Sequence, residues 1–352
     1  MTISEKTVMN DVFVCPHCRT SLQKSVNGDA YCVHCLFLLS RIGGVWALPS
    51  YDPDSYYADM PRTTLQYLLK VAKVKGGIRQ AMTERFGRVW ESRISEYALS
   101  LRRALFLEFI DLPARPHVLD YGCGFGALGL ATASFAGRVY LADSTLERVT
   151  FAQLHASELG LDNTFAVAGY EWNELPIPRR SLDLIILNGI LEWIPEPHTG
   201  DAAATQWAFL SSMQELLKPG GYLVLAIENR FALRYLTSYK DHTGIKYTSL
   251  MPRWLANTYS KIRLCRSYRT LTWSRSTYTK QLPKLGYEVP RFLYLWPDYR
   301  FPVRACWIDD AIALTALYKR YPQGRENKLF SVLGATISRH FLYSFAVISK
   351  AR

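Results

Sequence analysis

A short apolar strand followed by a glycine-rich turn is the part of this sequence best suited to hold a nucleoside cofactor. A short apolar run ends at Asp120, and Gly122, Gly124 and Gly126 follow it at alternate positions. Glycine adopts positive φ without steric cost and lets the backbone approach a ligand closely. The small residues that come next indicate a helix packed tightly on a sheet. The stretch therefore reads as a buried strand, a ligand-binding turn and a helix.

Two cofactors fit this turn, because Gly124-x-Gly126-x-x-Gly129 also satisfies the dinucleotide fingerprint. Asp120 favours S-adenosylmethionine, since a carboxylate attracts the ammonium group of an amino acid and would repel a pyrophosphate. A second strand ends at Asp143, whose carboxylate suits a ribose diol in either cofactor. A purely structural glycine turn is the remaining interpretation. The residues expected around S-adenosylmethionine here are Asp120, Gly122, Gly124, Gly126, Asp143 and Ser144.

Four cysteines near the N-terminus have the spacing of a zinc ribbon. Cys15 and Cys18 form one C-x2-C pair, Cys32 and Cys35 form a second, and 13 residues separate the pairs. Two such pairs complete the tetrahedral set of four thiolates that zinc prefers, and a closed set leaves no position for substrate. We therefore expect a structural zinc ion, in a ribbon that stabilises the N-terminus or contacts a protein partner.

Alternating strands and helices must position the chemical groups. A helix is expected over 146–159, and strands over 164–168 and 182–187. Another helix over 202–217 leads into a strand over 222–227. Strands separated by helices predict an α/β fold with a mostly parallel sheet covered on both faces. The carboxyl ends of the strands share one edge, so Asp120, Asp143, Asn188 and Glu228 should lie along one rim.

Composition indicates an ordinary globular protein with an uneven charge. Of the 352 residues, 49% are hydrophobic and 20% charged, and no apolar run reaches membrane-spanning length. The first residues lack the regions of a signal peptide, so we expect a cytoplasmic protein. Residues 229–352 hold 22 Lys and Arg against 6 Asp and Glu, and therefore carry the excess positive charge. That surface could face nucleic acid, anionic lipid or a phosphorylated substrate, or it could simply be solvated.

Three parts are expected along the chain. Residues 1–50 form the zinc ribbon, 51–110 form two or three helices that lead in to the sheet or cover it, and 111–352 form the main domain. Within the last part, residues 229–304 hold 15 Lys and Arg, 3 Asp and Glu, and many aromatic side chains. We interpret 229–304 as the insertion that binds the acceptor.

The combination of these motifs resembles the class I S-adenosylmethionine-dependent methyltransferases. The resemblance rests on residues 118–126, Asp143, the run 182–194 and the turn 216–221. It implies a Rossmann-like seven-stranded sheet with helices on both faces and an antiparallel last strand. It also implies cofactor contacts at Asp120, Gly122, Gly124, Asp143 and Asn188. The acidic residue usual beside the adenine amine is missing after the third strand, and we expect Glu171 or a backbone carbonyl in its place.

A narrower resemblance concerns the acceptor. Residues 187–193, 227–231, 241–244 and 252–257 are similar to those of a bacterial subgroup associated with cell-surface polysaccharide assembly. This similarity implies a sugar, glycan or related small metabolite, with or without phosphate, as the acceptor. Methylation of RNA is the second interpretation, supported by the ribbon and the basic C-terminal third. A non-catalytic scaffold that binds the cofactor is the third.

Methyl transfer to oxygen or nitrogen needs alignment and a base that removes the acceptor's proton. His242 is the first candidate for this base, with Asp241 beside it to orient the ring. Glu228 and Glu192 are alternative bases or binding groups, and a structural role for His242 is the remaining interpretation. Arg230 and Arg253 could pair with a phosphate or carboxylate of the acceptor, because a guanidinium offers two parallel donors.

Overall fold

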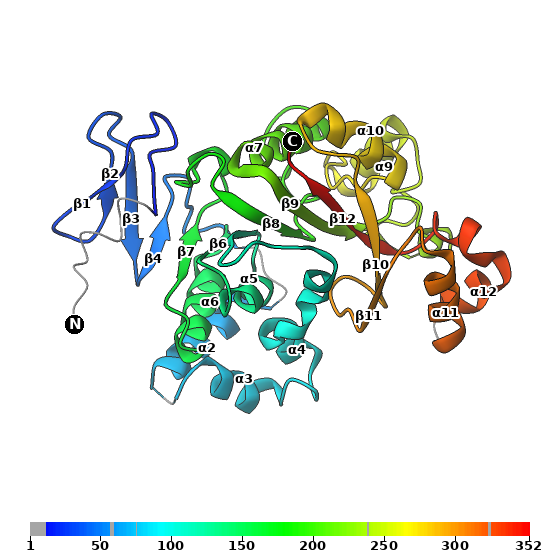
Figure 1. Ribbon diagram of the computed structural model, residues 1–352, viewed down its shortest axis with the longest axis horizontal. Coiled ribbons are helices and arrows are strands. Elements are labelled where there is room, and N and C mark those ends of the chain that lie inside the picture. Colours follow the sequence, from blue (N-terminus) through cyan, green and yellow to red (C-terminus); the bar gives the residue numbers. More distant parts are fainter. Residues whose placement is uncertain (1–11, 57–59, 75, 238, 323–324) are drawn as a thin grey trace. The chain divides into compact units, whose positions relative to one another are not determined.

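A computed structural model describes all of the chain except residues 1–11, 57–59, 75, 238 and 323–324. The described chain divides into two compact units, which are treated separately below (Figure 1). The first comprises Met1–Ala104, Asp111–Ile186 and Glu215–Gly221, and the second comprises Leu105–Ile110, Leu187–Gln214 and Tyr222–Arg352. The division into 1–50, 51–110 and 111–352 stays a prediction, because these units group residues by packing and cross its boundaries.

Eight strands lie in the first unit, in the order β1-β2-β3-β4-β7-β6-β5-β8, apart from the last two residues of β8, which belong to the second unit. They are β1 Gln23–Lys24, β2 Ala30–Tyr31, β3 Leu38–Ile42, β4 Val45–Ala47, β5 His117–Tyr121, β6 Arg138–Asp143, β7 Thr164–Ala168 and β8 Leu182–Asn188. Strands β5, β6 and β7 run parallel, with Asp120 opposite Leu141 and Ala142 opposite Val167. The parallel α/β arrangement expected from the alternating pattern is confirmed.

Helices of the first unit pack around the expected turn. They are α2 Arg62–Val74, α3 Ile78–Phe86, α4 Arg93–Leu99, α5 Ala127–Ala133, α6 Leu146–Glu158 and a short η2 Trp172–Glu174. Leu65 and Leu68 of α2 share one apolar core with Phe125 of the turn and Phe151 of α6. The helices expected within 51–110 therefore pack against the turn after β5. Figure 1 shows α2, α3 and α4 in blue and cyan, next to α5 and α6.

The second unit contains four strands in the order β9-β12-β10-β11, all antiparallel. They are β9 Leu217–Glu228, whose first five residues belong to the first unit, β10 Arg291–Trp296, β11 Arg304–Trp307 and β12 Ser344–Lys350. Its helices are η1 Leu101–Phe109, which begins in the first unit, α7 Ala202–Leu216, α8 Leu233–Leu236, α9 Arg253–Leu264, α10 Arg275–Gln281, η3 Leu282–Leu285, α11 Ala311–Arg320 and α12 Arg325–Ser338. The antiparallel last strand is confirmed, because Ala346 of β12 pairs with Ala226 of β9.

The expected number of seven strands is wrong, since the two units together hold twelve. Four additional strands come from the cysteine-rich N-terminal segment, because β4 pairs in parallel with β7 and so adds β1–β4 to that edge. The fifth is β11, which forms an antiparallel pair with β10. Pairing β4 with β7 satisfies backbone groups that an exposed sheet edge would leave open.

Residues 216–221 behave differently from a simple turn. Helix α7 ends at Leu216 and β9 begins at once with Leu217. Lys218 Nζ lies 2.8 Å from Oδ2 of the buried Asp183, and the same Oδ2 accepts a hydrogen bond from the backbone N–H of His117. Gly220 has φ of 80°, and a Cβ atom on Gly221 would lie 2.9 Å from the carbonyl oxygen of Leu182. These residues therefore anchor the start of β9 against β8.

No helix in the described part of the chain combines the length and apolar character needed to cross a bilayer.

Candidate active site

The glycine turn of the first unit is held in shape by Asp120. Gly122, Gly124 and Gly126 have φ angles of 71°, 55° and 81°, which L-residues with side chains rarely adopt. Asp120 is 1% exposed, and its Oδ2 accepts a hydrogen bond from the backbone N–H of Gly129 at 2.8 Å. Burial, opposed by that hydrogen bond, raises the pKa of Asp120 to about 7. Asp120 thus fastens the end of β5 to the start of α5.

Asp143 ties the same turn to β6. Its Oδ2 accepts a hydrogen bond from the backbone N–H of Gly124 at 2.9 Å, and its Oδ1 accepts one from Thr145 at 3.0 Å. A carboxylate has lone pairs beyond these two bonds, so Asp143 retains acceptor capacity for hydroxyl groups. A Cβ atom on Gly124 would meet no atom within 4 Å. Open space therefore borders the turn where a cofactor is expected.

The other expected cofactor residues lie at neighbouring strand ends. Ser144 follows Asp143 directly and is half-buried. Glu171 precedes η2, and its backbone N–H donates to Ser50 Oγ at 3.1 Å. Asn188 is the last residue of β8 and belongs to the second unit. Their roles toward a cofactor stay predictions.

The four N-terminal cysteines come together as expected from their spacing. The sulfur atoms of Cys15, Cys18, Cys32 and Cys35 all lie within 4.8 Å of one another, and all four are free thiols. The backbone N–H groups of Arg19 and Leu36 donate to the carbonyls of Cys15 and Cys32. Arg19 and Leu36 also have positive φ, at 65° and 58°. Two matching turns thus present four sulfurs to one point, a donor set that fits a tetrahedral zinc ion.

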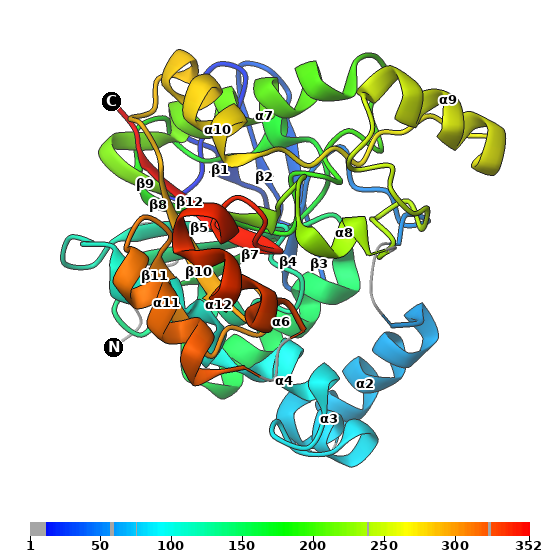
Figure 2. The same ribbon diagram turned by 90° about the vertical axis from the view of Figure 1, so that its right-hand side faces the viewer.

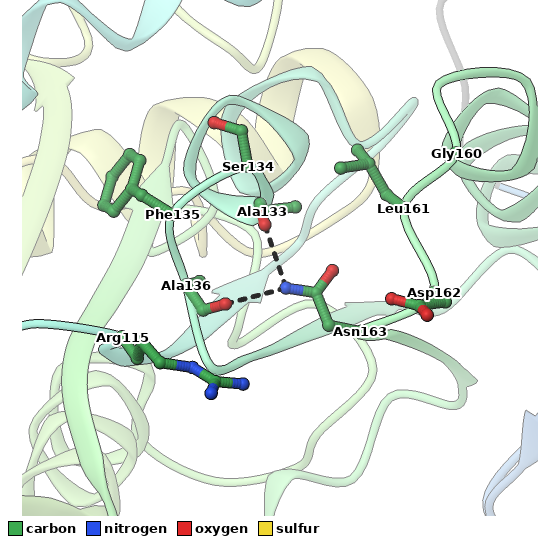
Figure 3. A pocket seen from close by; sticks show the side chains of 9 residues that line it. All are labelled: Arg115, Ala133, Ser134, Phe135, Ala136, Gly160, Leu161, Asp162 and Asn163. Carbon is green, nitrogen blue, oxygen red and sulfur yellow. Dashed lines mark hydrogen bonds between the residues drawn. The ribbon is translucent and has the colours of Figure 1, made fainter.

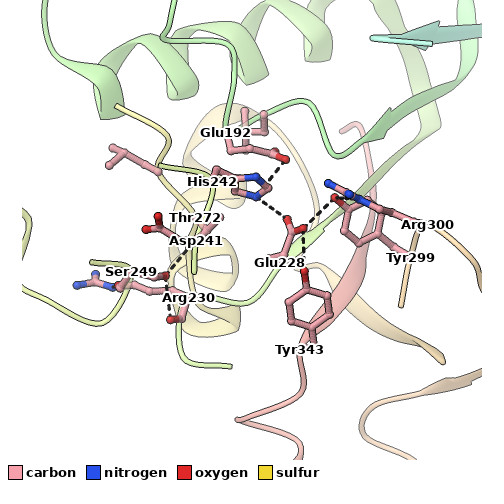
Figure 4. Close-up of polar contacts among 12 residues, drawn as sticks. Glu192, Glu228, Arg230, Asp241, His242, Ser249, Thr272, Tyr299, Arg300 and Tyr343 are labelled. Carbon is pink, nitrogen blue, oxygen red and sulfur yellow. Dashed lines mark hydrogen bonds and ion pairs between the residues drawn. The ribbon is translucent and has the colours of Figure 1, made fainter. Parts of the chain in front are cut away.

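A buried cluster of two carboxylates and one imidazole lies in the second unit (Figure 4). Glu228 ends β9, Glu192 lies in the turn after β8, and His242 lies in the loop after α8. His242 Nε2 lies 3.1 Å from Glu228 Oε2 and 3.6 Å from Glu192 Oε1. The ligand atoms of all three lie within 4.8 Å of one another, so this set could also receive a divalent cation.

The charges in this cluster are unequally compensated. Glu228 is 1% exposed, its Oε2 faces His242, and its Oε1 accepts hydrogen bonds from Tyr299 at 3.0 Å and Tyr343 at 3.4 Å. Glu192 is 0% exposed, and neither of its oxygens accepts a hydrogen bond from another described residue. A buried carboxyl group that accepts no hydrogen bond, and whose ion pair with His242 is as long as 3.6 Å, is costly, so a ligand that donates to Glu192 would stabilise it.

Burial and pairing move the pKa values of the three groups in different directions. Burial raises the pKa of Glu192 to about 7, although the charge of His242 opposes this. For His242, burial disfavours the charged ring, but the hydrogen bond and charge of Glu228 prevail and raise its pKa to about 9. Burial likewise opposes ionisation of Glu228, yet the hydrogen bond from His242 lowers its pKa. At neutral pH the cluster therefore holds a His242–Glu228 ion pair beside a carboxyl group close to its titration point.

Asp241 does not contact the imidazole that it was expected to orient. Its Oδ1 accepts hydrogen bonds from the backbone N–H and hydroxyl of Thr243, and its Oδ2 accepts from Thr248 and from Tyr268 at 2.9 Å. Adjacent side chains diverge here, so Asp241 shapes the loop and Glu228 orients the ring of His242.

The two arginines expected at the acceptor both bind backbone carbonyls. Arg230 donates to Ser249 and Met251, and Arg253 donates to Thr272. Nε and Nη1 of Arg253 are buried and have no hydrogen-bond partner among the described residues. Arg253 therefore retains donors that an acidic group of a ligand could use.

Tyr299 and Tyr343 were not found from the sequence. Tyr299 lies in the loop between β10 and β11, and Tyr343 directly precedes β12. Gly189 makes room for Tyr299, since a Cβ atom there would lie 2.6 Å from the Tyr299 hydroxyl. The positive φ of Gly189 in the run 187–193 is the one local signal that could have indicated a close neighbour.

A hollow of about 440 Å³ lies in the first unit, away from the turn (Figure 3). Its lining includes Arg115 before β5, Phe135 before β6 and Asp162 before β7, so it borders the amino ends of the strands. Asn163 closes one side by donating to the carbonyls of Ala133 and Ala136. Ligands of open α/β sheets bind at the opposite, carboxyl edge, and the hollow is therefore separate from the expected cofactor site.

Comparison with known proteins agrees with this geometry. A family model described as a methyltransferase domain matches residues 114–251. A ubiquinone biosynthesis O-methyltransferase of Xanthomonas axonopodis pv. citri is 31% identical over 147 residues, which is 41% of this chain and 57% of that protein. The same-named protein of Actinobacillus pleuropneumoniae serotype 7 is 29% identical over 154 residues, 42% of this chain and 62% of that protein.

The chain thus spans somewhat more than half the length of these relatives. Among solved structures, a SAM-dependent methyltransferase from Aquifex aeolicus is 21% identical and aligns with a TM-score of 0.34, over 48% of this chain and 85% of that one. The family match therefore identifies a methyltransferase domain over residues 114–251, which contains the glycine turn after β5 and the parallel strands beside it.

Proposed function

We propose that this protein transfers the methyl group of S-adenosylmethionine to an oxygen or nitrogen atom of a small-molecule acceptor. The observation that carries the proposal is the buried carboxyl group of Glu192, which accepts no hydrogen bond from a described residue, beside the His242–Glu228 ion pair in a chain with a methyltransferase domain. Such a group is costly to maintain in a core and is typical of a site that completes its hydrogen bonds with a ligand.

The first unit supplies the cofactor site in this proposal. Asp143 hydrogen-bonds the ribose hydroxyls with its remaining lone pairs, and the backbone around Gly124 contacts the cofactor through the open space there. Asp120, Ser144 and Glu171 are the further contacts proposed from this unit, and Asn188 of the second unit is kept as a proposed contact on the ground of the sequence. The bound cofactor supplies an electrophilic methyl group on a sulfonium.

The second unit supplies the groups that prepare the acceptor. Glu192 accepts the proton of the attacking hydroxyl or amine. Because its pKa lies near neutrality, a large share of the molecules have it ionised and ready to take up that proton, and it binds the proton well once it has done so. His242 stays protonated through Glu228 and orients the acceptor by donating to it. General base catalysis contributes about 10²- to 10⁴-fold to a rate, and alignment of the reactants contributes more.

The acceptor we propose is a hydroxyl-bearing small metabolite, with a sugar or glycan as the first class to test. The narrower resemblance within 187–257 supports a sugar, and the similarity to two ubiquinone biosynthesis O-methyltransferases supports O-methylation. Arg253 then pairs with a phosphate or carboxylate of the acceptor through its unpartnered donors. The four cysteines hold one structural zinc ion that takes no part in the transfer.

Binding and turnover of the full chain separate this function from its rivals. Calorimetry should show S-adenosylmethionine binding, and methyl transfer should be measured with sugars, nucleotide sugars and phenols. Cofactor binding without transfer to any acceptor would identify a non-catalytic scaffold, and absence of cofactor binding would contradict the proposed function. Transfer that stops on dialysis against EDTA and returns with Mg²⁺ or Mn²⁺ would instead assign Glu192, Glu228 and His242 to a metal ion.

A further inference from the structure

Helix α9 turns an apolar face to solvent. Of its twelve residues only Ala256 and Ser260 are buried, whereas Trp254 is 71% and Ile262 is 73% exposed. Leu255 is also exposed. A surface helix of a globular protein normally buries its apolar face and exposes its polar one. In α9 large apolar side chains face the solvent, while a small and a polar side chain face the protein. The outward face of α9 is therefore available to a partner.

The exposed apolar residues of α9 form one stripe. Trp254 and Ile262 lie two helical turns apart on the same side of the helix, and Leu255 lies next to Ile262 on that side. Thr258 lies between Trp254 and Ile262, and its hydroxyl donates to the carbonyl of Trp254. Ala256 and Ser260 lie on the other side, and Ser260 Oγ donates there to the carbonyl of Arg266. Figure 2 shows α9 at the margin of the drawing, followed by a loop that returns toward α10. The stripe is therefore a continuous surface along the helix.

Positive charge borders this stripe on both sides. Lys261 and Arg263 flank Ile262 and are exposed, as is Arg266 just after the helix. Residues 242–287 include nine Lys and Arg and no Asp or Glu. A helix with apolar residues on its outer face and cations at the edges of that face lies in the plane of a membrane interface, with the cations at anionic head groups.

We propose that α9 is a docking surface for an anionic lipid bilayer, with Trp254, Leu255 and Ile262 inserted at the boundary between head groups and acyl chains. Tryptophan is the residue most enriched at that depth. An RNA backbone would satisfy the cations but would leave the aliphatic side chains of the stripe in water. The lipid surface therefore explains both the apolar stripe and its charged edges. This inference goes beyond the proposed methyl transfer and does not depend on it.

Sedimentation of the full chain with vesicles tests the proposal without any cofactor. The protein should bind vesicles of equal parts phosphatidylcholine and phosphatidylglycerol, and should bind phosphatidylcholine alone much more weakly. The double substitution Trp254→Ser with Ile262→Ser should weaken binding to the mixed vesicles at least about tenfold, because two large side chains no longer leave water. Lys261→Gln with Arg263→Gln should weaken vesicle binding about fivefold for each charge removed, and should make that binding less sensitive to salt.

Ile312→Ser is the matched control, since Ile312 is 85% exposed but lies on α11. It should leave vesicle binding unchanged, and circular dichroism should show all variants folded. Vesicle binding that survives Trp254→Ser with Ile262→Ser overturns the proposal. Salt-dependent binding of single-stranded RNA that is equal in wild type and in this double variant, without vesicle binding, would identify a nucleic-acid surface instead. Because the readout is sedimentation, failure here leaves the methyl-transfer proposal untouched.

Discussion

His242 and Glu228 form the central contact of the second unit, with Nε2 of the ring 3.1 Å from Oε2 of the carboxylate. The two residues are 14 positions apart, whereas the sequence neighbour Asp241 bonds Thr243, Thr248 and Tyr268. Glu228 therefore fixes both the orientation and the charge of the imidazole. Glu192 is less well compensated, because it lies 3.6 Å from the same ring and accepts no hydrogen bond from a described residue, and the sharpest predictions concern it.

Glu192→Gln should lower turnover by about 10² to 10⁴-fold, since the amide keeps the shape of the side chain but cannot accept a proton. Affinity for S-adenosylmethionine should change little, which calorimetry can measure on the same sample. Glu196→Gln is the control, because Glu196 is an acid in the same loop that is not part of the cluster. Full turnover in Glu192→Gln would remove this residue from the mechanism.

The pH dependence of kcat/KM should be bell-shaped. Glu192 must be ionised to accept a proton, so the rate should rise as the pH passes about 7. His242 must keep its proton to donate to the acceptor, so the rate should fall as the pH passes about 9. These two ionisations belong to the cluster as a whole, because the groups interact. Any activity that remains in Glu192→Gln should lack the acidic limb, and a rate that is flat across both values contradicts the assignment.

Short-range spacing was enough to predict several features. These features are the turn with Asp120 and Gly124, the acid at Asp143 and the four cysteines. Each depends on residues close together in the sequence, at the end of a strand or within a turn, so local patterns were enough to find it. The partners of Glu228 could not be found in this way. Tyr299 and Tyr343 lie 71 and 115 positions away, and only the antiparallel pairing of β9 with β12 and of β12 with β10 brings their loops to the end of β9.

Helix α9 illustrates a second limit. From the sequence, 229–304 is interpreted only as an insertion, and neither this helix nor the side of it that is covered is identified. Packing of Ala256 and Ser260 decides this in the structure, and it leaves Trp254 outside. The strand count failed for a related reason, because pairing of β4 with β7 depends on two backbone edges meeting and not on either local sequence.

Asp143→Asn should weaken binding of S-adenosylmethionine about tenfold or more, because a charged acceptor for hydroxyl groups is replaced by a neutral one. The amide also weakens the bond from Gly124 that shapes the turn. Calorimetry with S-adenosylmethionine and S-adenosylhomocysteine measures the loss. Asp162→Asn is the control, since Asp162 lines the hollow at the amino ends of the strands. Unchanged affinity in Asp143→Asn, or lost affinity in Asp162→Asn, would place the cofactor elsewhere.

Cys32→Ser should remove one zinc ion per chain and lower the thermal midpoint of unfolding. Cys32 is buried and its Sγ lies 3.4 Å from Sγ of Cys18, so loss of this thiolate leaves three donors where a structural zinc needs four. Mass spectrometry of metals on the purified protein gives the zinc content, and calorimetric scanning gives the midpoint.

Cys265→Ser is the control for this prediction. Cys265 is an exposed thiol outside the cluster, so its substitution should change neither quantity. Because β4 continues from this ribbon into the pairing with β7, the loss of zinc should destabilise the first unit and not only its N-terminal strands. Wild-type protein that contains no zinc and melts like Cys32→Ser would exclude a metal role for these cysteines.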